Sequence, residues 1–377
     1  MPKSSIQQLA EYGQSIWLDY INRPMLENGE LKGRIANGLR GMTSNPSIFQ
    51  KAIGTTHDYD REIIRLKSEG KSTFEIYDAL TIKDIQDAAD CFKGVYDQTN
   101  GLDGYVSLEI NPLLATKVEE QKKEGIRLYK KVNRPNVMIK VPSTVQGVSV
   151  IEELIAEGIN VNATLIFSLK QYEQTAKAYL NGLKRLKAKG GNLSKIHSVA
   201  SVFVSRVDAV IDPLLKSKIA LAKDGVEKQK KSALLGKAAV ANCRIIFEKY
   251  KEIFSTDEFI RLQSDGANAQ RVLWGSTSTK DPAYSDVKYI SELITSPTVN
   301  TVPEPTLKAF LDHGVVKEAF GNSPEDSLQV IDQLSELGIH ISDVNNQLLI
   351  DGCAAFDDAF EGLLKSVEEK ASALIQK

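Results

Sequence analysis

Short apolar segments that end in polar residues alternate with longer amphipathic segments along most of the chain. We count eight apolar segments, which are Ser15–Asp19, Gly38–Thr43, Tyr105–Ile110, Val137–Val141, Asn160–Phe167, His197–Val204, Arg271–Trp274 and Thr298–Val302. Helical periodicity is found between them, over Ile76–Phe92, Ala115–Val132, Gly147–Glu157 and Leu169–Ala188. Strands that alternate with helices are typical of parallel βαβ units. Eight such strands predict an α/β fold, a (β/α)8 barrel of the TIM type.

The chain has 377 residues, which exceeds the roughly 250 residues typical of such a barrel. We expect the surplus in helical insertions, one over Asp208–Leu262 between the sixth and seventh strands and one from Glu304 onward. The second should contain helices over Leu328–Leu337 and Cys353–Ile375. The amphipathic pattern of the last helix, including residues 356–364, predicts ordinary packing more than a cover over the barrel mouth. Because no Pro/Gly/Ser linker divides the chain, we predict a single domain over residues 1–377.

Composition narrows the class of protein. The chain is 42% hydrophobic and 25% charged, which is typical of globular proteins. Its 47 basic and 49 acidic residues give no net field that would attract nucleic acid or an anionic membrane. Its histidines lack metal-site spacing and it has no phosphate-binding glycine motif, so we expect no metal and no other cofactor. Three widely spaced cysteines, with no signal peptide or long apolar run, predict a cytoplasmic protein.

Lys140 lies inside the apolar segment 137–142. A lysine amine is seldom buried unless another group pairs with it or a reaction uses it. The ordinary explanation is an edge strand whose lysine faces solvent. The alternative is an amine kept partly desolvated, so that it is neutral and attacks a carbonyl carbon as a nucleophile.

Polar residues occupy the ends of the other predicted strands as well. They are Asp19, Thr43, Ser44, Asn45, Glu109, Asn111, Lys140, Asn162, Thr164, Ser201, Ser205, Arg206 and the segment 276–280. In a (β/α)8 barrel, catalytic residues lie at these C-terminal strand ends. The strand period of two puts Ser107 and Glu109 on one face, and it puts Asn162 and Thr164 on one face. If these faces and that of Lys140 point inward, one amine and two carboxylates share a cavity.

A primary amine with two carboxylates suits carbonyl chemistry through a Schiff base. Neutral lysine adds to a ketone, a proton donor assists the loss of water, and a second acid–base group takes a hydroxyl proton when a carbon–carbon bond breaks. The competing interpretation is that Asp19, Glu109 and Lys140 form an internal salt-bridge network that only stabilises the barrel. Arg206 and Lys280, beside hydroxyl residues, suit a phosphate monoester.

Five ordered segments resemble the signature segments of transaldolase. They are GMTSNPSIF (41–49), SLEINPLLA (107–115), VMIKVPST (137–144), VNATLIFS (161–168) and SVASVFVSRVDA (198–209). The resemblance extends from IWLDYINR (16–23) to LWGSTSTKDP (273–282) and SPTVNTVPEPTL (296–307), so it covers most of the chain. The segments WLD and WGSTSTKDP within these stretches are similar to those of a longer subgroup of the family that is found in bacteria. The family is part of the class I Schiff-base aldolases.

The resemblance implies a transferase of aldehyde or ketone residues in the non-oxidative pentose phosphate pathway of carbohydrate metabolism. The implied reaction moves a dihydroxyacetone unit from sedoheptulose 7-phosphate or fructose 6-phosphate to glyceraldehyde 3-phosphate or erythrose 4-phosphate. Sugar phosphates are therefore the expected partners, with no nucleic acid and no membrane. Either a monomer or a homodimer is compatible with the sequence.

The resemblance also implies roles for individual residues. Lys140 would form the Schiff base, and Glu109, through a water held by Thr164, would transfer protons as the imine forms and hydrolyses. Asp19 would take the donor hydroxyl proton and return it. The implied substrate-binding residues are Thr43, Asn45, Asn162 and Ser201 near the hydroxyls, and Arg206 at the phosphate. Many relatives carry a second arginine after the seventh strand, where either Lys280 or the neighbouring hydroxyls and backbone would replace it here.

Two other functions remain open at this point. A Schiff-base aldolase of the fructose-6-phosphate type would release free dihydroxyacetone instead of transferring it. The smaller aldolases of the superfamily usually place a tyrosine and a glutamine around the water, so the pair Asp19 and Glu109 favours transfer. A non-catalytic barrel scaffold is the third possibility, and it has no reason to bury Lys140 together with both carboxylates.

Overall fold

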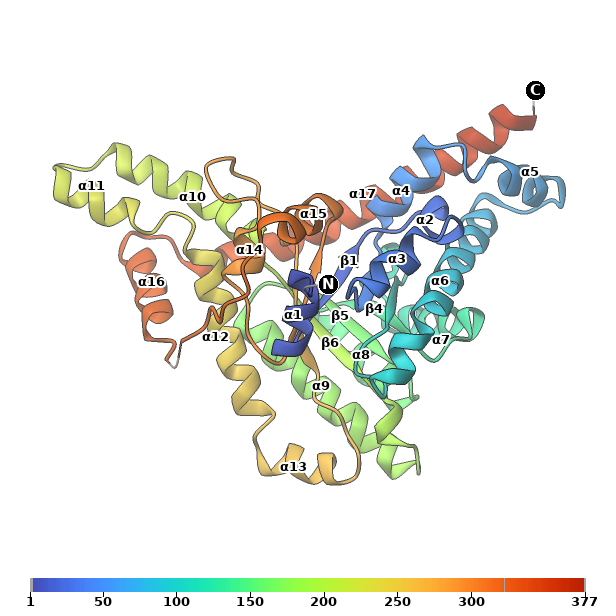
Figure 1. The fold of residues 1–377 in the computed structure, drawn as a ribbon, viewed down its shortest axis with the longest axis horizontal. Coiled ribbons are helices and arrows are strands. Elements are labelled where there is room, and N and C mark those ends of the chain that lie inside the picture. The colour runs from blue at the N-terminus through green and yellow to red at the C-terminus, as the bar shows by residue number, and fades with distance from the viewer. Residues whose placement is uncertain (1–2, 322, 376–377) are drawn as a thin grey trace.

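The computed structural model describes residues 3–321 and 323–375. Its centre is a closed barrel of eight parallel strands in sequence order, in which β8 pairs with β1 (Figure 1). The strands are β1 (Gln14–Asp19), β2 (Gly41–Thr43), β3 (Val106–Glu109), β4 (Val137–Pro142), β5 (Val161–Ile166), β6 (Ser198–Phe203), β7 (Arg271–Gly275) and β8 (Thr298–Val302). Each predicted apolar segment overlaps one of these strands, so the prediction of a (β/α)8 barrel is confirmed.

Helices surround this barrel and connect its strands. Before β6 they are α1 (Ser5–Tyr12), α2 (Arg23–Glu27), α3 (Glu30–Ala36), α4 (Pro46–Thr55), α5 (Asp60–Ser68), α6 (Thr73–Gln98), η1 (Pro112–Leu114), α7 (Val118–Val132), α8 (Val145–Ala156), α9 (Leu169–Ala188) and η2 (Leu193–Lys195). After β6 they are α10 (Ser205–Ala220), α11 (Gly225–Ser232), α12 (Ala238–Ile253), α13 (Asp257–Ser264), α14 (Lys288–Ser291), α15 (Glu304–His313), α16 (Glu325–Glu336) and α17 (Ile341–Ile375). Among the described residues, no helix combines the length and the apolar character that crossing a membrane requires.

Side chains that cap the first turn explain where several of these helices begin. Ser72 and Glu75 form a capping box at the start of α6, and Ser168 and Gln171 form another at the start of α9. Each box satisfies backbone N–H groups that have no partner within the helix. The second box begins α9 directly after the end of β5, which keeps that connecting loop short, whereas α6 follows α5.

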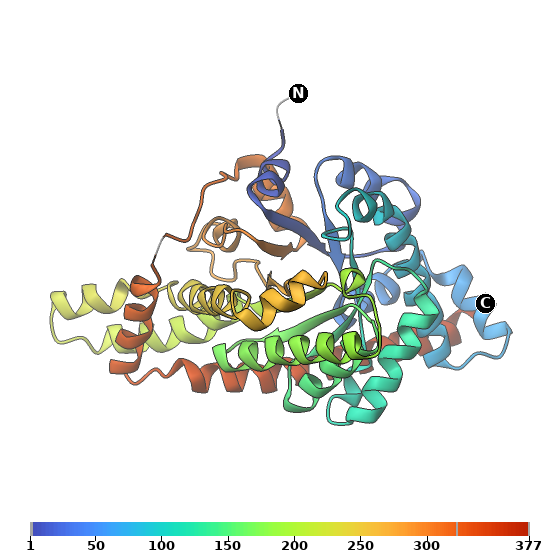
Figure 2. The same ribbon diagram turned by 90° about the horizontal axis from the view of Figure 1, so that it is seen from below.

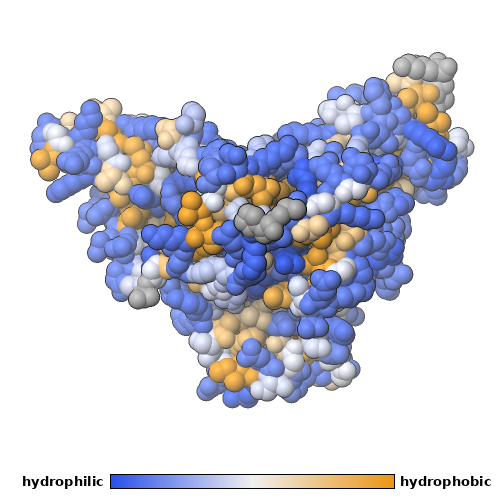
Figure 3. Space-filling view, viewed as in Figure 1, coloured by the Kyte–Doolittle hydropathy of each residue, from blue (hydrophilic) through white to orange (hydrophobic). Residues whose placement is uncertain are grey.

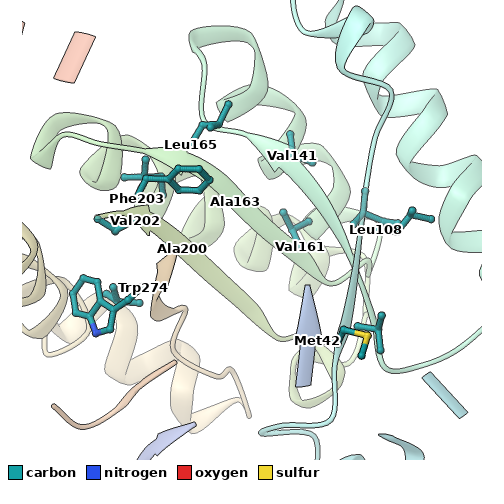
Figure 4. Packing of buried hydrophobic residues seen from close by; sticks show 14 of the residues in the cluster. Met42, Leu108, Val141, Val161, Ala163, Leu165, Ala200, Val202, Phe203 and Trp274 are labelled. Carbon is teal, nitrogen blue, oxygen red and sulfur yellow. The ribbon is translucent and has the colours of Figure 1, made fainter. Parts of the chain in front are cut away.

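Successive side chains along each strand pack in two different layers. Outward side chains belong to the large core between the sheet and the helices, and Figure 4 shows Val141, Val161, Ala163 and Trp274 among them. Inward side chains form a separate cluster that fills the barrel, made of Trp17, Tyr105, Met138, Val199, Leu273 and Val299. The barrel is therefore closed by packed side chains, and polar groups are left for its two ends.

A buried ion pair closes the N-terminal end of the barrel. Arg271 Nη2 lies 2.8 Å from Asp103 Oδ1, and their side chains are 8% and 6% exposed. The same guanidinium donates a hydrogen bond to Ser15 Oγ at 3.0 Å, and Ser15 Oγ donates to Asp103 Oδ2 at 2.7 Å. Because buried charges require partners, this network is a structural element of the barrel base.

The expected insertions are present, but the predicted starts of β2 and of the last helix are wrong. Helices α10–α13 lie between β6 and β7, and α15–α17 follow β8. Strand β2 begins at Gly41 and not at Gly38, because Gly38 (φ 110°) and Leu39 end the preceding helix with hydrogen bonds to Ile35 O and Arg34 O. The last helix begins at Ile341 and not at Cys353, since Gly338 (φ 71°) separates it from α16.

Two parts project from the barrel. Helices α10 and α11 extend at one end of the molecule and α5 with the end of α17 at the other (Figure 1). Helix α17 runs along one side of the molecule between these ends (Figure 2), in contact with α10, β5, α4 and α5. Hydrophilic residues predominate on the face shown in Figure 3, with smaller hydrophobic areas between them. The length of α17 brings its middle to the C-terminal ends of the strands.

Candidate active site

A cavity of about 450 Å³ opens at the C-terminal ends of the strands. Eight of the predicted site residues line it, namely Asp19, Thr43, Asn45, Lys140, Thr164, Ser201, Arg206 and Lys280. The remaining two, Glu109 and Asn162, do not line it and lie behind the others. The structure therefore brings eight of the ten predicted site residues to one cavity, and their roles there stay predictions.

Lys140 is buried, with 5% of its surface exposed, and its amine points into this ring. Its Nζ lies 3.6 Å from Glu109 Oε2 and donates a hydrogen bond to the backbone oxygen of Ser44 at 3.3 Å. Strand register explains this arrangement, because Glu109 and Lys140 are paired across β3 and β4. The interpretation of an edge strand with a solvent-facing lysine is thus excluded.

Glu109 has an unusual environment for a carboxyl group. Burial raises its pKa to about 7, and the nearby charge of Lys140 limits the rise. Its Oε2 atom and Thr164 Oγ1 are both buried, and neither has a hydrogen-bond partner among the described residues. Buried polar atoms without a protein partner are rare, and such atoms commonly contact a water or a ligand. Glu109 and Thr164 therefore suit the transfer of a proton near the amine.

Asp19 approaches the cavity from β1 and has a different set of partners. Burial raises its pKa, while the charge of Lys140 and a hydrogen bond from Thr43 lower it. The Thr43 hydroxyl lies 2.7 Å from Asp19 Oδ1 and 2.7 Å from Thr301 Oγ1. Asp19 is therefore a carboxyl group held in one orientation at the cavity wall by its neighbour on β2.

Polar side chains of β3, β5 and β6 form a short chain of hydrogen bonds beside Lys140. Ser201 Oγ donates to Asn162 Oδ1 at 2.6 Å, and Asn162 Nδ2 donates to Ser107 Oγ at 3.0 Å. Asn162 is fully buried and pairs with Lys140 across β4 and β5. Ser201 is therefore the member of this chain that reaches the cavity. Asn45 caps α4 through its side-chain oxygen, which accepts from Ile48 N–H at 3.0 Å.

Two cations, Arg206 and Lys280, also line the cavity. Arg206 lies in the first turn of α10, and Lys280 lies in the loop after β7 together with Ser276 and Ser278. Burial lowers the pKa of both cations, and the charge of Arg206 lowers that of Lys280 further. Arg206 has no hydrogen-bond partner among residues 3–321 and 323–375. Two adjacent cations at the N-terminus of a helix are typical of a site for a phosphate group.

Helix α17 contributes a residue to the cavity wall, which corrects the expectation of ordinary packing alone. The amine of Lys140 lies 5.6 Å from the centre of the Phe356 ring. Phe356 is 6% exposed and separates the cavity from Glu109, Cys353 and Asp357 behind it. The close approach depends on Gly352, where an added Cβ would lie 3.1 Å from Leu165 and 3.6 Å from Arg206.

Comparison with known proteins identifies the family to which this chain belongs. The family model described as transaldolase/fructose-6-phosphate aldolase matches residues 16–367. The chain belongs to the transaldolase/fructose-6-phosphate aldolase family. It is 44% identical to the transaldolase of Trichodesmium erythraeum, over 99% of both chains. It is 42% identical to transaldolase 2 of a Nostoc species over 99% of both chains, and 43% identical to the transaldolase of Saccharopolyspora erythraea over 97% and 98% of the two chains.

Several residues of this transaldolase-family cavity are missed by sequence reasoning. They are Tyr20, Lys51, Phe203, Leu273, Thr301 and Phe356. The signal for Thr301 is available, because the period of two along β8 gives it the inward face of Val299. No signal in the sequence places Phe356, since its position depends on how α17 packs against distant helices.

Proposed function

We propose that this chain transfers a dihydroxyacetone unit between sugar phosphates through a Schiff base on Lys140. The observation that carries the proposal is the buried amine of Lys140, which faces a cavity lined by Asp19 and a pair of cations and lies 3.6 Å from the carboxyl group of Glu109 behind the cavity wall. The family membership supports it, because the relatives named above are transaldolases. The donor would be sedoheptulose 7-phosphate or fructose 6-phosphate, and the acceptor glyceraldehyde 3-phosphate or erythrose 4-phosphate.

In the first stage, neutral Lys140 adds to the ketone carbon of the donor and forms a carbinolamine. Water leaves when a proton reaches the carbinolamine hydroxyl, and Glu109 is the proposed source of that proton. A pKa of about 7 supports this role, because both protonation states of the carboxyl group are then populated near neutral pH. The hydroxyl of Thr164, at the cavity wall, would hold the water that carries the proton.

In the second stage, the iminium ion accepts the electron pair of the carbon–carbon bond that breaks. Asp19 takes the proton from the donor hydroxyl, so that the aldose phosphate leaves and an enamine of dihydroxyacetone stays on Lys140. The enamine then attacks the acceptor aldehyde, and Asp19 returns the proton. The hydrogen bond from Thr43 supports this role, because it orients one carboxylate oxygen and leaves the other for the substrate.

The remaining polar groups would bind the two ends of the substrate. Asn45 and Ser201 line the cavity beside Lys140 and are the proposed partners of the dihydroxyacetone hydroxyls, with Asn162 orienting Ser201. Arg206 would pair with the phosphate at the far side, and Lys280 would supply the second positive charge there. A cytoplasmic location is part of this proposal, and the three unpaired cysteines support it.

Trapping with borohydride tests the covalent step. The protein is incubated with fructose 6-phosphate and borohydride, and the adduct is mapped by mass spectrometry. Lys51 and Lys280 line the same cavity but are exposed, which provides an internal control. We expect the adduct on the peptide that contains Lys140 and none on the peptides of the other two lysines. An unmodified Lys140 would refute the Schiff-base proposal.

A second measurement separates transfer from simple cleavage. The protein is incubated with fructose 6-phosphate, with and without erythrose 4-phosphate as acceptor. A transaldolase moves the dihydroxyacetone unit to erythrose 4-phosphate, so it forms sedoheptulose 7-phosphate and glyceraldehyde 3-phosphate only when the acceptor is present, and it releases little free dihydroxyacetone. Steady release of dihydroxyacetone without an acceptor would instead assign the aldolase activity that shares the family description.

A further inference from the structure

The loop between β7 and α14, residues 276–287, is tied to helix α10 by a buried carboxylate. Tyr284 in this loop donates a hydrogen bond from its hydroxyl to Asp212 Oδ2 at 2.6 Å. Asp212 is 4% exposed, and its Oδ1 accepts a hydrogen bond from the Gly236 N–H at 2.9 Å. The carboxylate thus joins the loop to the segment between α11 and α12, and neither Asp212 nor these two hydrogen-bond partners line the Lys140 cavity.

Packing reinforces this connection. Gly236 has φ 68°, and an added Cβ would lie 2.8 Å from Tyr284 Cζ, so the tyrosine ring rests directly on the glycine. Burial raises the pKa of Tyr284, and the hydrogen bond to Asp212 raises it further, so the hydroxyl remains a donor. A second, more exposed tether joins Asp281 of the loop to Lys216 of α10 at 2.9 Å.

Helix α10 carries one cation of the predicted phosphate site and also the residue that holds the loop of the other cation. Arg206 lies in the first turn of α10, and Asp212 lies further along the same helix. Lys280, four residues before Tyr284, lines the cavity with Arg206 and also lines the neighbouring cavity with Asp212 and Tyr284. The distance between the two cations therefore depends on how firmly Tyr284 is held to α10.

We infer that Asp212, acting through Tyr284, is a positioning residue that holds Lys280 beside Arg206 for the phosphate group of the substrate. The inference rests on the proposed function, because it assumes that these cations receive a phosphate. It goes beyond it by assigning a task to the insertion between β6 and β7, which otherwise only extends the barrel. The structural alternative is that the bond holds the insertion in place and has no effect on phosphate binding.

The chain offers a matched control for this alternative. Tyr289 donates a hydrogen bond to Asp208 Oδ2 at 2.8 Å, and Asp208 Oδ1 accepts from the Ala239 N–H at 2.8 Å. This pair has the same chemistry on the same helix, but Tyr289 lies in α14, beyond the loop that carries Lys280. Tyr284→Phe and Tyr289→Phe each remove one hydroxyl, and only the first releases the loop.

Inorganic phosphate serves as the probe, and calorimetry measures its binding to the whole protein. We expect Tyr284→Phe to weaken phosphate binding about tenfold, since a held cation contributes one charge-assisted hydrogen bond. It should raise the KM of the phosphorylated donor similarly and leave kcat within about twofold of wild type. Tyr289→Phe should leave both unchanged. Asp281→Asn, on the exposed tether, should weaken phosphate binding to a smaller extent and is a second test that does not disturb the core.

Three outcomes would overturn the inference. They are wild-type protein that binds no phosphate, unchanged phosphate binding in Tyr284→Phe, and equal weakening in the two tyrosine variants. Borohydride trapping on Lys140 separates these results from failure of the proposed function. Trapping that succeeds in wild type and in Tyr284→Phe, with unchanged phosphate binding, would reject the positioning role alone.

Discussion

Replacement of Glu109 by Gln tests the link between the burial of this carboxyl group and its chemistry. Burial raises its pKa from the ordinary value of 4.5 to about 7. A difference of this size corresponds to about 3 kcal/mol. Because the pKa is higher in the folded state, the folded protein binds the proton more tightly than the unfolded chain. The stabilisation is therefore complete below about pH 4.5 and is lost as the pH rises through 7.

Urea unfolding between about pH 5 and about pH 8 measures this effect. We expect the free energy of unfolding of Glu109→Gln to fall less steeply with pH than that of wild type, by up to about 3 kcal/mol over the range. Asp208→Asn is the matched control, because burial raises the pKa of Asp208 to about 6 and Asp208 does not line the Lys140 cavity. This variant should also flatten the pH dependence of stability.

Activity distinguishes the two carboxyl groups. If Glu109 transfers protons during imine formation, kcat/KM of wild type should show an inflection near pH 7. Glu109→Gln should lose this inflection, and its kcat/KM should fall by a factor of about 10² to 10⁴. Asp208→Asn should keep the inflection and the rate of wild type. Equal pH dependence of stability in wild type and Glu109→Gln would refute the raised pKa. An inflection that persists in Glu109→Gln would refute the assignment of the proton transfer.

Three further predictions follow from the contacts of single side chains. Arg271→Met should lower the free energy of unfolding by about 3–5 kcal/mol in urea titrations, because it leaves Asp103 buried without a counter-ion; Arg134→Met, in an exposed pair, should cost about 0–1 kcal/mol. Phe356→Leu should increase the release of free dihydroxyacetone on the order of tenfold, measured by product analysis without an acceptor, because the ring no longer shields the amine from water. Lys140→Ala should abolish turnover and keep the circular dichroism spectrum of wild type, and an unfolded variant would favour a purely structural lysine.

The fold and the centre of the site are predictable because they depend on local patterns. Short apolar segments with helices between them identify the strands, and the period of two assigns Glu109 and Lys140 to inward faces. The register of β3 and β4 then brings the two side chains together. The same patterns do not predict where β2 begins, because Leu39 is apolar but its N–H group bonds to Arg34 O at the end of a helix.

Long-range packing explains what the sequence does not predict. The periodicity of α17 indicates an apolar face, but it does not specify that the helix packs against α4 and α5, which lie far away in the chain. Only that packing brings Phe356 to the amine of Lys140. The role of Asp212 is also not predictable from the sequence. Asp212 is one acidic residue in a lysine-rich helical segment, and its hydrogen-bond partner Tyr284 lies in a distant loop.

The two carboxyl groups near Lys140 share one amine and differ in their hydrogen bonds, and this difference argues for separate roles. Burial raises the pKa of Asp19, and the hydrogen bond that it accepts from Thr43 opposes this rise by favouring the carboxylate form, which suits a base. Glu109 Oε2 has no hydrogen-bond partner among the described residues, and its raised pKa of about 7 keeps both the acid and the carboxylate form populated near neutral pH. A salt-bridge network selected for stability would supply donors to both carboxylates. The difference in hydrogen bonding between Asp19 and Glu109 therefore favours a role in proton transfer at Lys140 over a structural role.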